Sequence, residues 1–247
     1  MLLSCNNIGS RCEWSDVQEV LAALRVVGRS PIGDDAGVVI SNGTYDPIMP
    51  SPQTFNNLEV QAGAILTLNS FDLTVNGDAT VSGTITASGS ETITLSNLTV
   101  SGTVTLAGTE TVLVAGDLNL TGGTLTEASS HVILNGNAAQ SVTSAGNSFS
   151  TLTMSNQSAL VTFADAVQAT LYYSQSGNVT YGDDFTATQF HVYSDNGSIT
   201  QVFNAGSTYA IQEFWLNGSV GKVQHLKSSS TSTWNLNVSG FATVDYV

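Results

Sequence analysis

Apolar and small polar residues alternate along most of this chain, from Val38 almost to the last residue. Alternation with a period of two is typical of β-strands that bury one face and expose the other. The alternating runs are short, and Gly or Asn residues separate them. Because Gly and Asn tolerate positive φ angles, they favour turns. The pattern therefore predicts an all-β chain of short strands and frequent turns.

One segment near the N-terminus has a different period. Its apolar residues recur at the i, i+3, i+4, i+7 spacing of a single helical face. Ser15 stands where it can cap the first turn, and Gly28 stands where a helix would stop. We therefore predict an amphipathic helix over residues 15–27. The apolar face of this helix consists of Val17, Val20, Leu21 and Leu24.

A five-residue unit recurs through the chain: apolar, polar, apolar, polar or small, then glycine. Gly77 and Gly102 are 25 residues apart, as are Gly83 and Gly108, and Gly218 precedes Gly240 by 22. A chain that returns to the same place every 22 to 25 residues is typical of a β-solenoid. The copies of the unit end at Gly77, Gly83, Gly102, Gly108, Gly122, Gly136, Gly218 and Gly240.

The strands are too short and the turns too frequent for a β-sandwich. We therefore predict a right-handed parallel β-helix over residues 33–247, with about nine turns stacked ~4.8 Å apart. Residues 1–32 form an N-terminal segment, whose helix is expected to cover the open edge of the first turn. The C-terminal end has no such cap, so we expect the chain to continue or this end to contact another copy. The residues expected in that contact are Leu236, Val238, Phe241, Val244 and Tyr246.

Two stretches carry a resemblance to a known family. Residues 33–83 open with Gly-Asp-Asp-Ala-Gly-Val-Val-Ile and contain Asn-Leu-x-Val-x-x-Gly-Ala-x-Leu-x-Leu at 57–68. Residues 203–247 begin Phe-Asn-Ala-Gly-Ser-Thr-Tyr and contain Trp-Asn-Leu-Asn-Val-Ser-Gly. These segments resemble the repeats of bacterial extracellular adhesin-like surface proteins with a pectin-lyase-like fold. The resemblance implies a right-handed parallel β-helix, secretion to the cell surface and a longer parent chain. It assigns no catalytic residue.

The charge of the chain excludes some partners. Five Lys and Arg residues stand against nineteen Asp and Glu, which gives a net charge of −14. Residues 30–221 contain no Lys or Arg at all. Nucleic acids need clustered cations to displace their counterions, so we do not expect nucleic acid as a partner. No apolar run approaches the ~20 residues of a transmembrane helix, so we expect no membrane insertion.

Parallel β-helices often cleave polysaccharides, and the sequence offers limited material for this chemistry. A lyase is disfavoured because it depends on Arg or Lys, and the predicted β-helix contains no Arg. A hydrolase needs two carboxylates on neighbouring turns, for which Asp183, Asp184 and Asp195 are the candidates. The simpler interpretation is that these residues form solvated turns. Calcium is a weaker alternative for the same oxygen-rich turns; otherwise we expect no metal or cofactor.

Aromatic residues concentrate in residues 172–234 and beyond. If Phe214 points inward, Trp215 points outward, and exposed rings on neighbouring turns would form a surface for stacking on sugars. The alternative is a wide core filled by stacked aromatic rings. The candidates for contact with a glycan are Tyr193, Tyr209, Trp215 and Trp234.

Thr-x-Thr pairs recur between residues 84 and 126. An array of outward threonines could order water as ice-binding proteins do, although Thr is also simply a favoured strand residue. Irregular turn lengths between residues 83 and 136 argue against a flat array. The pairs are Thr84 and Thr86, Thr92 and Thr94, Thr103 and Thr105, and Thr124 and Thr126.

The two cysteines, Cys5 and Cys12, either form a small disulfide loop in an oxidising compartment or remain free thiols. Taken together, these observations predict a non-enzymatic, extracellular structural or adhesive module, which acts as a stalk or associates with itself. A carbohydrate-binding module is the alternative, and a polysaccharide hydrolase comes third. The expected partner is a second copy of the chain or an extracellular polysaccharide.

Overall fold

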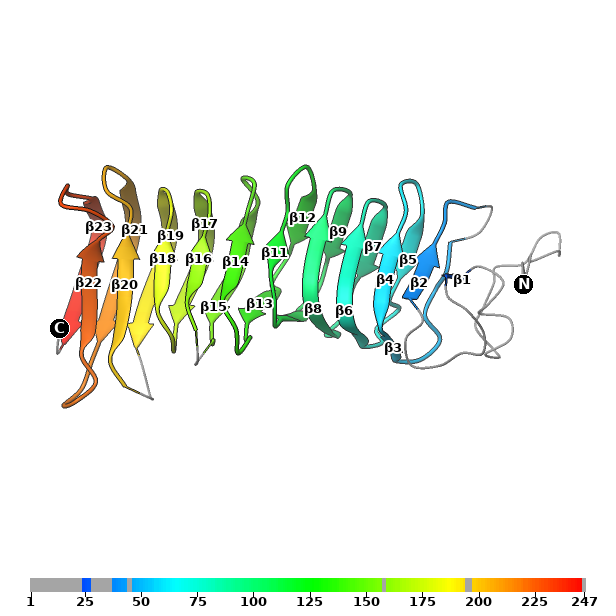
Figure 1. Cartoon of the computed structure of the whole chain (residues 1–247), viewed down its shortest axis with the longest axis horizontal. Coiled ribbons are helices and arrows are strands. Elements are labelled where there is room, and N and C mark those ends of the chain that lie inside the picture. The colour runs from blue at the N-terminus through cyan, green and yellow to red at the C-terminus, as the bar shows by residue number, and fades with distance from the viewer. Residues whose placement is uncertain (1–23, 28–36, 44–45, 157–158, 194–196, 246–247) are drawn as a thin grey trace. The chain divides into compact units, whose positions relative to one another are not determined.

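The computed structural model describes residues 24–27, 37–43, 46–156, 159–193 and 197–245 (Figure 1). All regular secondary structure in these ranges is β-strand. Each strand pairs in parallel with the strand one turn further along, and the result is a parallel β-solenoid of about 9 turns. The predicted all-β solenoid class is confirmed. Among the described residues, no helix is long and apolar enough to cross a bilayer.

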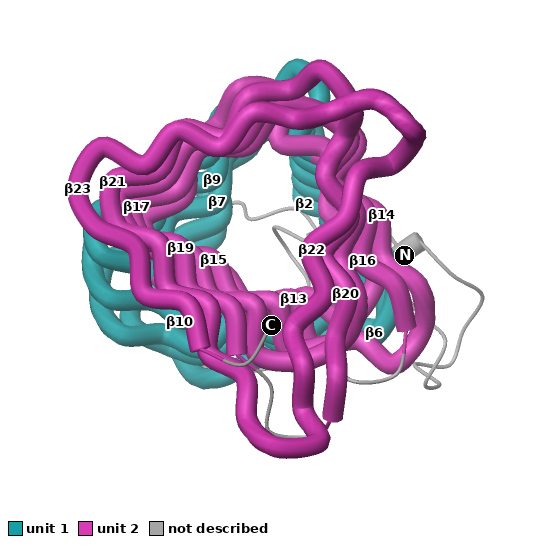
Figure 2. The backbone as a smooth tube through the Cα atoms, turned by 90° about the vertical axis from the view of Figure 1, so that its left-hand side faces the viewer, with its two compact units in different colours: residues 1–112, 120–130 teal, residues 113–119, 131–247 magenta. Residues whose placement is uncertain are grey.

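The chain divides into two compact units, residues 1–112 with 120–130 and residues 113–119 with 131–247 (Figure 2). In the first unit, β2, β4, β6 and β8 pair in sequence, and β5, β7, β9 and β12 form a separate four-stranded parallel sheet. β10 (Thr111–Val114) falls at the division between the units. The strands of the first unit are β1 (Leu24–Val27), β2 (Gly37–Ile40), β3 (Gln53–Phe55), β4 (Asn57–Val60), β5 (Ile65–Thr67), β6 (Leu73–Val81), β7 (Thr84–Ala87), β8 (Thr92–Val100), β9 (Thr103–Leu106) and β12 (Thr124–Glu127).

In the second unit, the even-numbered strands from β14 to β22 stack on one another in parallel, and so do the odd-numbered strands from β13 to β23. The odd-numbered strands from β15 onward are long and carry two faces of each turn. The strands of this unit are β11 (Leu118–Asn119), β13 (His131–Leu134), β14 (Gln140–Thr143), β15 (Ser148–Met154), β16 (Val161–Phe163), β17 (Val167–Ser174), β18 (Val179–Tyr181), β19 (Phe185–Tyr193), β20 (Ile199–Phe203), β21 (Thr208–Asn217), β22 (Gln224–Ser228) and β23 (Asn235–Asp245).

The predicted N-terminal helix is wrong in its last four residues. Leu24–Val27 is strand β1, which pairs antiparallel with the free edge of β2. The β-branched pair Val26-Val27 suits a strand, and the backbone of β1 saturates edge groups of β2 that a helix would leave unpaired. Residues 15–23 lie outside the described residues, as do Cys5 and Cys12.

The repeat of the first unit is shorter than predicted. Ser101 bonds Ser82 across 19 residues, and Thr92 bonds Asp72 across 20. Gly102 therefore stacks on Gly83, and Gly77 and Gly102 are not equivalent positions. Turns in the second unit are longer, since the bond from Val223 to Ser198 spans 25 residues.

The two units have different cores. Buried columns in the first unit are aliphatic, such as Val60, Val81 and Val100. In the second unit aromatic rings stack from turn to turn: Tyr181 lies 5.6 Å from Phe163 and 5.1 Å from Phe203. The alternative that stacked rings fill a wide core is thus confirmed for these side chains. Larger buried rings explain how longer turns remain packed.

Candidate functional site

Trp215 lies on the outer surface, as its position in the sequence predicts. Phe214 and Leu216 are buried, while Trp215 between them is partly exposed. The register places Trp215 beside His191 of β19, and His191 beside Tyr173 of β17. The three residues therefore form one outward column across three turns, which we name the aromatic column.

The rings of the aromatic column stack on each other. The ring centroids of Tyr173 and His191 are 4.9 Å apart, and those of His191 and Trp215 are 5.4 Å apart with nearly parallel planes. Phe241 packs edge-on against Trp215 at 5.0 Å. Because neighbouring rings occupy the faces of the indole, a sugar could stack on Trp215 only by displacing one of them. The column therefore serves packing between turns better than contact with a flat ligand.

The polar atoms of the aromatic column are also withdrawn from solvent. Nε2 of His191 and Nε1 of Trp215 are buried and have no hydrogen-bond partner among the described residues. Burial lowers the pKa of His191, against a smaller opposing effect of the nearby Glu213 carboxylate. Glu213 itself accepts a 2.7 Å hydrogen bond from Gln189. At neutral pH His191 is thus an uncharged ring in a stack.

The other predicted aromatic candidates divide between the surface and the core. Tyr193 is partly exposed and packs edge-on against Tyr173. Tyr209 is fully buried, and burial raises the pKa of its hydroxyl to about 12. Trp234 stacks on the buried Phe203 with 4.2 Å between centroids. Tyr209 and Trp234 therefore extend the aromatic core and do not join Trp215 on the outer surface.

The acidic candidates lie in a turn and bond backbone amides. The Asp184 carboxylate accepts a 2.7 Å bond from the amide of Thr208, one turn further on. Asp183 accepts a bond from the amide of Asp184. Asp195 lies outside the described residues. No group of three or more His, Cys, Asp or Glu that could hold a metal ion occurs among the residues with described positions.

Other carboxylates join successive turns in the same way. Asp72 accepts from the amide of Thr92, and Asp165 accepts from the amides of Ser144 and Ala145. In the sequence, Asp72 and Asp184 each directly precede the first apolar residue of a strand. An acidic residue at that position is a signal for this role.

Two buried carboxylates were missed by reasoning from the sequence. Glu91 is 1% exposed and accepts hydrogen bonds from the amides of Ser70, Ser88 and Gly89. Glu110 occupies the same place one turn later and accepts from Gly108. The signal was present as Gly-Ser-Glu-Thr at 89–92 and Gly-Thr-Glu-Thr at 108–111. Both carboxylates hold turns in shape and are closed to solvent.

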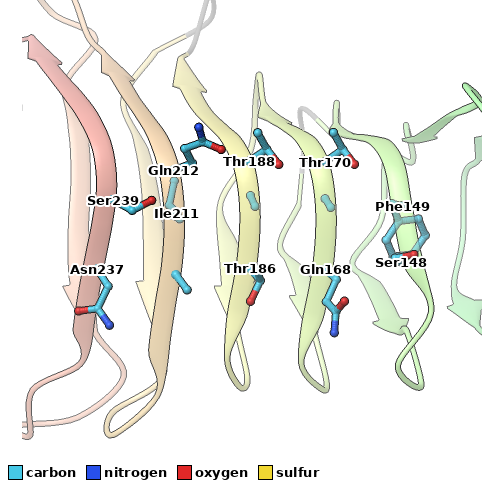
Figure 3. Close-up of a pocket in the computed structure, with 13 residues that line it drawn as sticks. Ser148, Phe149, Gln168, Thr170, Thr186, Thr188, Ile211, Gln212, Asn237 and Ser239 are labelled. Carbon is cyan, nitrogen blue, oxygen red and sulfur yellow. The ribbon is translucent and has the colours of Figure 1, made fainter.

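The long strands of the second unit form an open groove of about 430 Å³ where they bend (Figure 3). Two rows of polar side chains follow the groove from turn to turn: Gln168, Thr186 and Asn237 lie along one side, and Thr170, Thr188 and Gln212 along the other. The buried side chains of Ala169, Ala187 and Ile211 lie between these rows.

The polar groups of the groove are available for a ligand. Side chains of Gln168, Gln212 and Asn237 are exposed and make no hydrogen bond to any other described residue. This contrasts with Asp184 or Glu91, whose oxygens are already bonded to the backbone. No charged residue lines the groove. The arrangement presents uncharged donors and acceptors at intervals of one strand, ~4.8 Å.

The predicted end-contact residues lie on β23. Leu236 and Val238 continue the inward columns of Tyr209 and Ile211 but are only partly buried. Val244 likewise follows the buried Leu216 and is 48% exposed. Phe241 instead points outward against Trp215, and Tyr246 lies outside the described residues. Within the described chain, β23 pairs with β21 alone.

Comparison with known proteins gave no match: neither a protein-family model, nor a curated protein, nor a solved structure is similar to this chain. The class to which the chain belongs is therefore the one its own fold defines, the parallel β-solenoids. The adhesin-like, pectin-lyase-like resemblance stays a prediction.

Proposed function

We propose that this chain is a non-enzymatic, extracellular β-solenoid module with a structural and adhesive role, which binds neutral glycans in the groove of its second unit. The groove carries the proposal. Exposed amides and hydroxyls line it in two rows, and they are not engaged with the rest of the described protein.

The shape of the groove supports an extended ligand. Equivalent positions repeat from β17 to β19 to β21, as Gln168, Thr186 and Ala210 do in the strand register. A linear polysaccharide also presents the same hydroxyls at every sugar, so several turns can bind several sugars in the same way. Hydrogen-bonding rims with a small apolar floor are common in carbohydrate sites, where the floor contacts the C–H faces of the rings.

The charge of the protein supports a neutral ligand. The net charge is −14, and no lysine or arginine lines the groove. A polyuronate would be repelled without any cation to pair with its carboxylates. We therefore propose uncharged glycans as the ligand class.

The test is retention of the full chain in gels that contain soluble neutral polysaccharides, compared with the double variant Gln168→Ala/Gln212→Ala. Two lost hydrogen bonds at ~1 kcal/mol each should weaken binding by roughly ten- to thirtyfold. Gln61→Ala, an exposed glutamine of the first unit, is the matched control and should bind as the parent protein does. All three proteins should melt together, since exposed substitutions are usually stability-neutral.

Two results would refute the groove. One is no retention of the parent protein by any neutral polysaccharide, and the other is equal retention of the double variant. Trp215→Ala separates the groove from the aromatic column. The groove proposal expects this variant to keep its binding, whereas loss of binding would place the glycan on Trp215 and its neighbours.

A specific observation also favours self-association as a second candidate function. Leu236, Val238 and Val244 of β23 belong to inward apolar columns and remain partly exposed. An edge of this kind pairs readily with another strand. We propose that a second copy covers it.

Light scattering over a range of concentrations tests this second candidate. We expect oligomers of the parent protein and monomers of the double variant Val238→Lys/Val244→Lys. Val220→Lys is the control, because Val220 is 88% exposed elsewhere in the second unit and should not matter. A parent protein that stays monomeric at every concentration would exclude the association.

A further inference from the structure

The four-stranded sheet of the first unit carries an ordered threonine array. β7, β9 and β12 contain Thr-x-Thr, and the strand register aligns these pairs without a slip. Thr67 of β5 extends one of the two columns by a further row. The expectation that irregular turns would break such an array is therefore wrong for this sheet. The pairs on the array are Thr84 and Thr86, Thr103 and Thr105, and Thr124 and Thr126, whereas Thr92 and Thr94 lie on β8, outside this sheet.

The backbone holds the array in register. The amide of Thr103 bonds the carbonyl of Gly83 at 2.8 Å, and that of Thr124 bonds Gly102 at 2.8 Å. A Cβ on Gly102 would meet the carbonyl oxygen of Gly83, so glycine allows these turns to approach closely. Between the outward threonines, Ile85 and Val104 point into the core and are buried. Because Thr is β-branched, its hydroxyl and methyl groups also have few rotamers.

The array is a neutral surface in a strongly acidic protein. Ser82 and Ser101 flank it on one side, and Ser88 and Ala107 flank it on the other. The net charge of the chain is −14, yet no charged side chain stands in the two columns or these flanks. The threonine hydroxyls of β7, β9 and β12 make no hydrogen bond to any other described residue. These hydroxyls are free to bond molecules outside the protein.

The array repeats in two directions. Neighbouring strands lie ~4.8 Å apart, and outward residues along one strand lie ~6.6 Å apart. Each repeat presents one hydroxyl and one methyl group. A partner that matches such a surface must itself repeat in two dimensions, carry no charge, and offer both donors and acceptors. The surface of ice has these properties, with lattice spacings close to those of the array.

We infer that the threonine array on β5, β7, β9 and β12 binds ice by holding water in a lattice-like arrangement. The hydroxyls replace water molecules of the lattice, and the methyl groups rest in the hollows between them. This function is separate from the groove, since the two sites lie in different units of the chain.

The experiment measures thermal hysteresis and partition into a growing ice front for the full chain. We expect the parent protein to show hysteresis and to be enriched in ice. Thr105→Lys, in the middle of the array, should lose both properties, and Thr103→Tyr should do so from the other column. Thr99→Lys on β8 is the matched control, because Thr99 is an exposed strand threonine outside the array.

Thermal melts of all four proteins show whether each variant is folded. Absence of hysteresis and of ice partition in the parent protein would overturn the inference, and so would unchanged behaviour of folded Thr105→Lys. Adsorption of the parent protein to crystalline chitin or cellulose, without affinity for ice, would also overturn it and would assign the array to a different lattice.

Discussion

Stacked glycines set the closest approach between turns. Gly102 lies against Gly83, and Gly108 lies against Gly89 in the same way. In each pair a Cβ would meet a backbone carbonyl oxygen, which cannot move aside as a flexible side chain could. These residues are therefore required by the space between turns and not by an unusual φ angle.

Gly102→Ala should destabilise the first unit. The added methyl group must push two hydrogen-bonded turns apart, and overpacking of this kind costs roughly 1–3 kcal/mol. Urea unfolding measures the effect. Gly43→Ala is the control, since a Cβ there meets only one backbone atom at an ordinary 3.8 Å. Equal stabilities of the two variants would contradict the stacked-glycine account.

Reasoning from the sequence placed side chains correctly until a strand irregularity intervened. The alternation around Phe214 predicted the outward position of Trp215. The same alternation places Tyr209 outward, but the pairing of β21 with β23 shifts between Ile211 and Glu213. Because one extra residue reverses which face a side chain occupies, Tyr209 and Ile211 point inward with Phe214. Nothing in the local sequence marks that shift.

At the scale of elements, carboxylates shape the turns between strands. Glu91 is the clearest case, because its two oxygens accept three backbone amide bonds from two successive turns. Removing an acceptor leaves buried donors without a partner, which costs more than the net value of a hydrogen bond.

Glu91→Ala should therefore lower the free energy of unfolding by at least about 2 kcal/mol. Glu59→Ala is a matched control, because Glu59 is exposed and bonds only the side chain of Gln61. Thermal or urea unfolding of both variants checks the difference. A Glu91→Ala protein as stable as Glu59→Ala would show that these amides find other partners.

The number of elements was easier to predict than their spacing. The five-residue unit occurs more than once per turn in the first unit, so pairing Gly77 with Gly102 joined copies that are not equivalent. The true partner of Gly102 is Gly83, which the bond between Ser82 and Ser101 identifies. Likewise, the helical spacing near the N-terminus extended to Leu24, where pairing with β2 imposes a strand. In both cases a contact distant in the sequence decides the structure.

At the scale of the whole molecule, the charge and the polar surfaces have separate roles. The net charge of −14 keeps copies of the chain apart in solution. Many of the carboxylates bond backbone amides in turns, and the strand faces are left to Ser, Thr, Asn and Gln. Each unit consequently presents a neutral, repeating outer surface: the threonine array in the first and the groove in the second. A repeated fold thus supplies repeated binding positions without any catalytic group.

The central claim is that the groove of the second unit holds a neutral glycan. The most direct test is NMR of the side-chain amides during titration with a neutral oligosaccharide, cut from a polysaccharide that retains the protein. The account predicts that the amide signals of Gln168, Gln212 and Asn237 shift together, while that of Asn76 in the first unit stays in place. An oligosaccharide that binds and leaves all three groove amides unshifted would contradict the account.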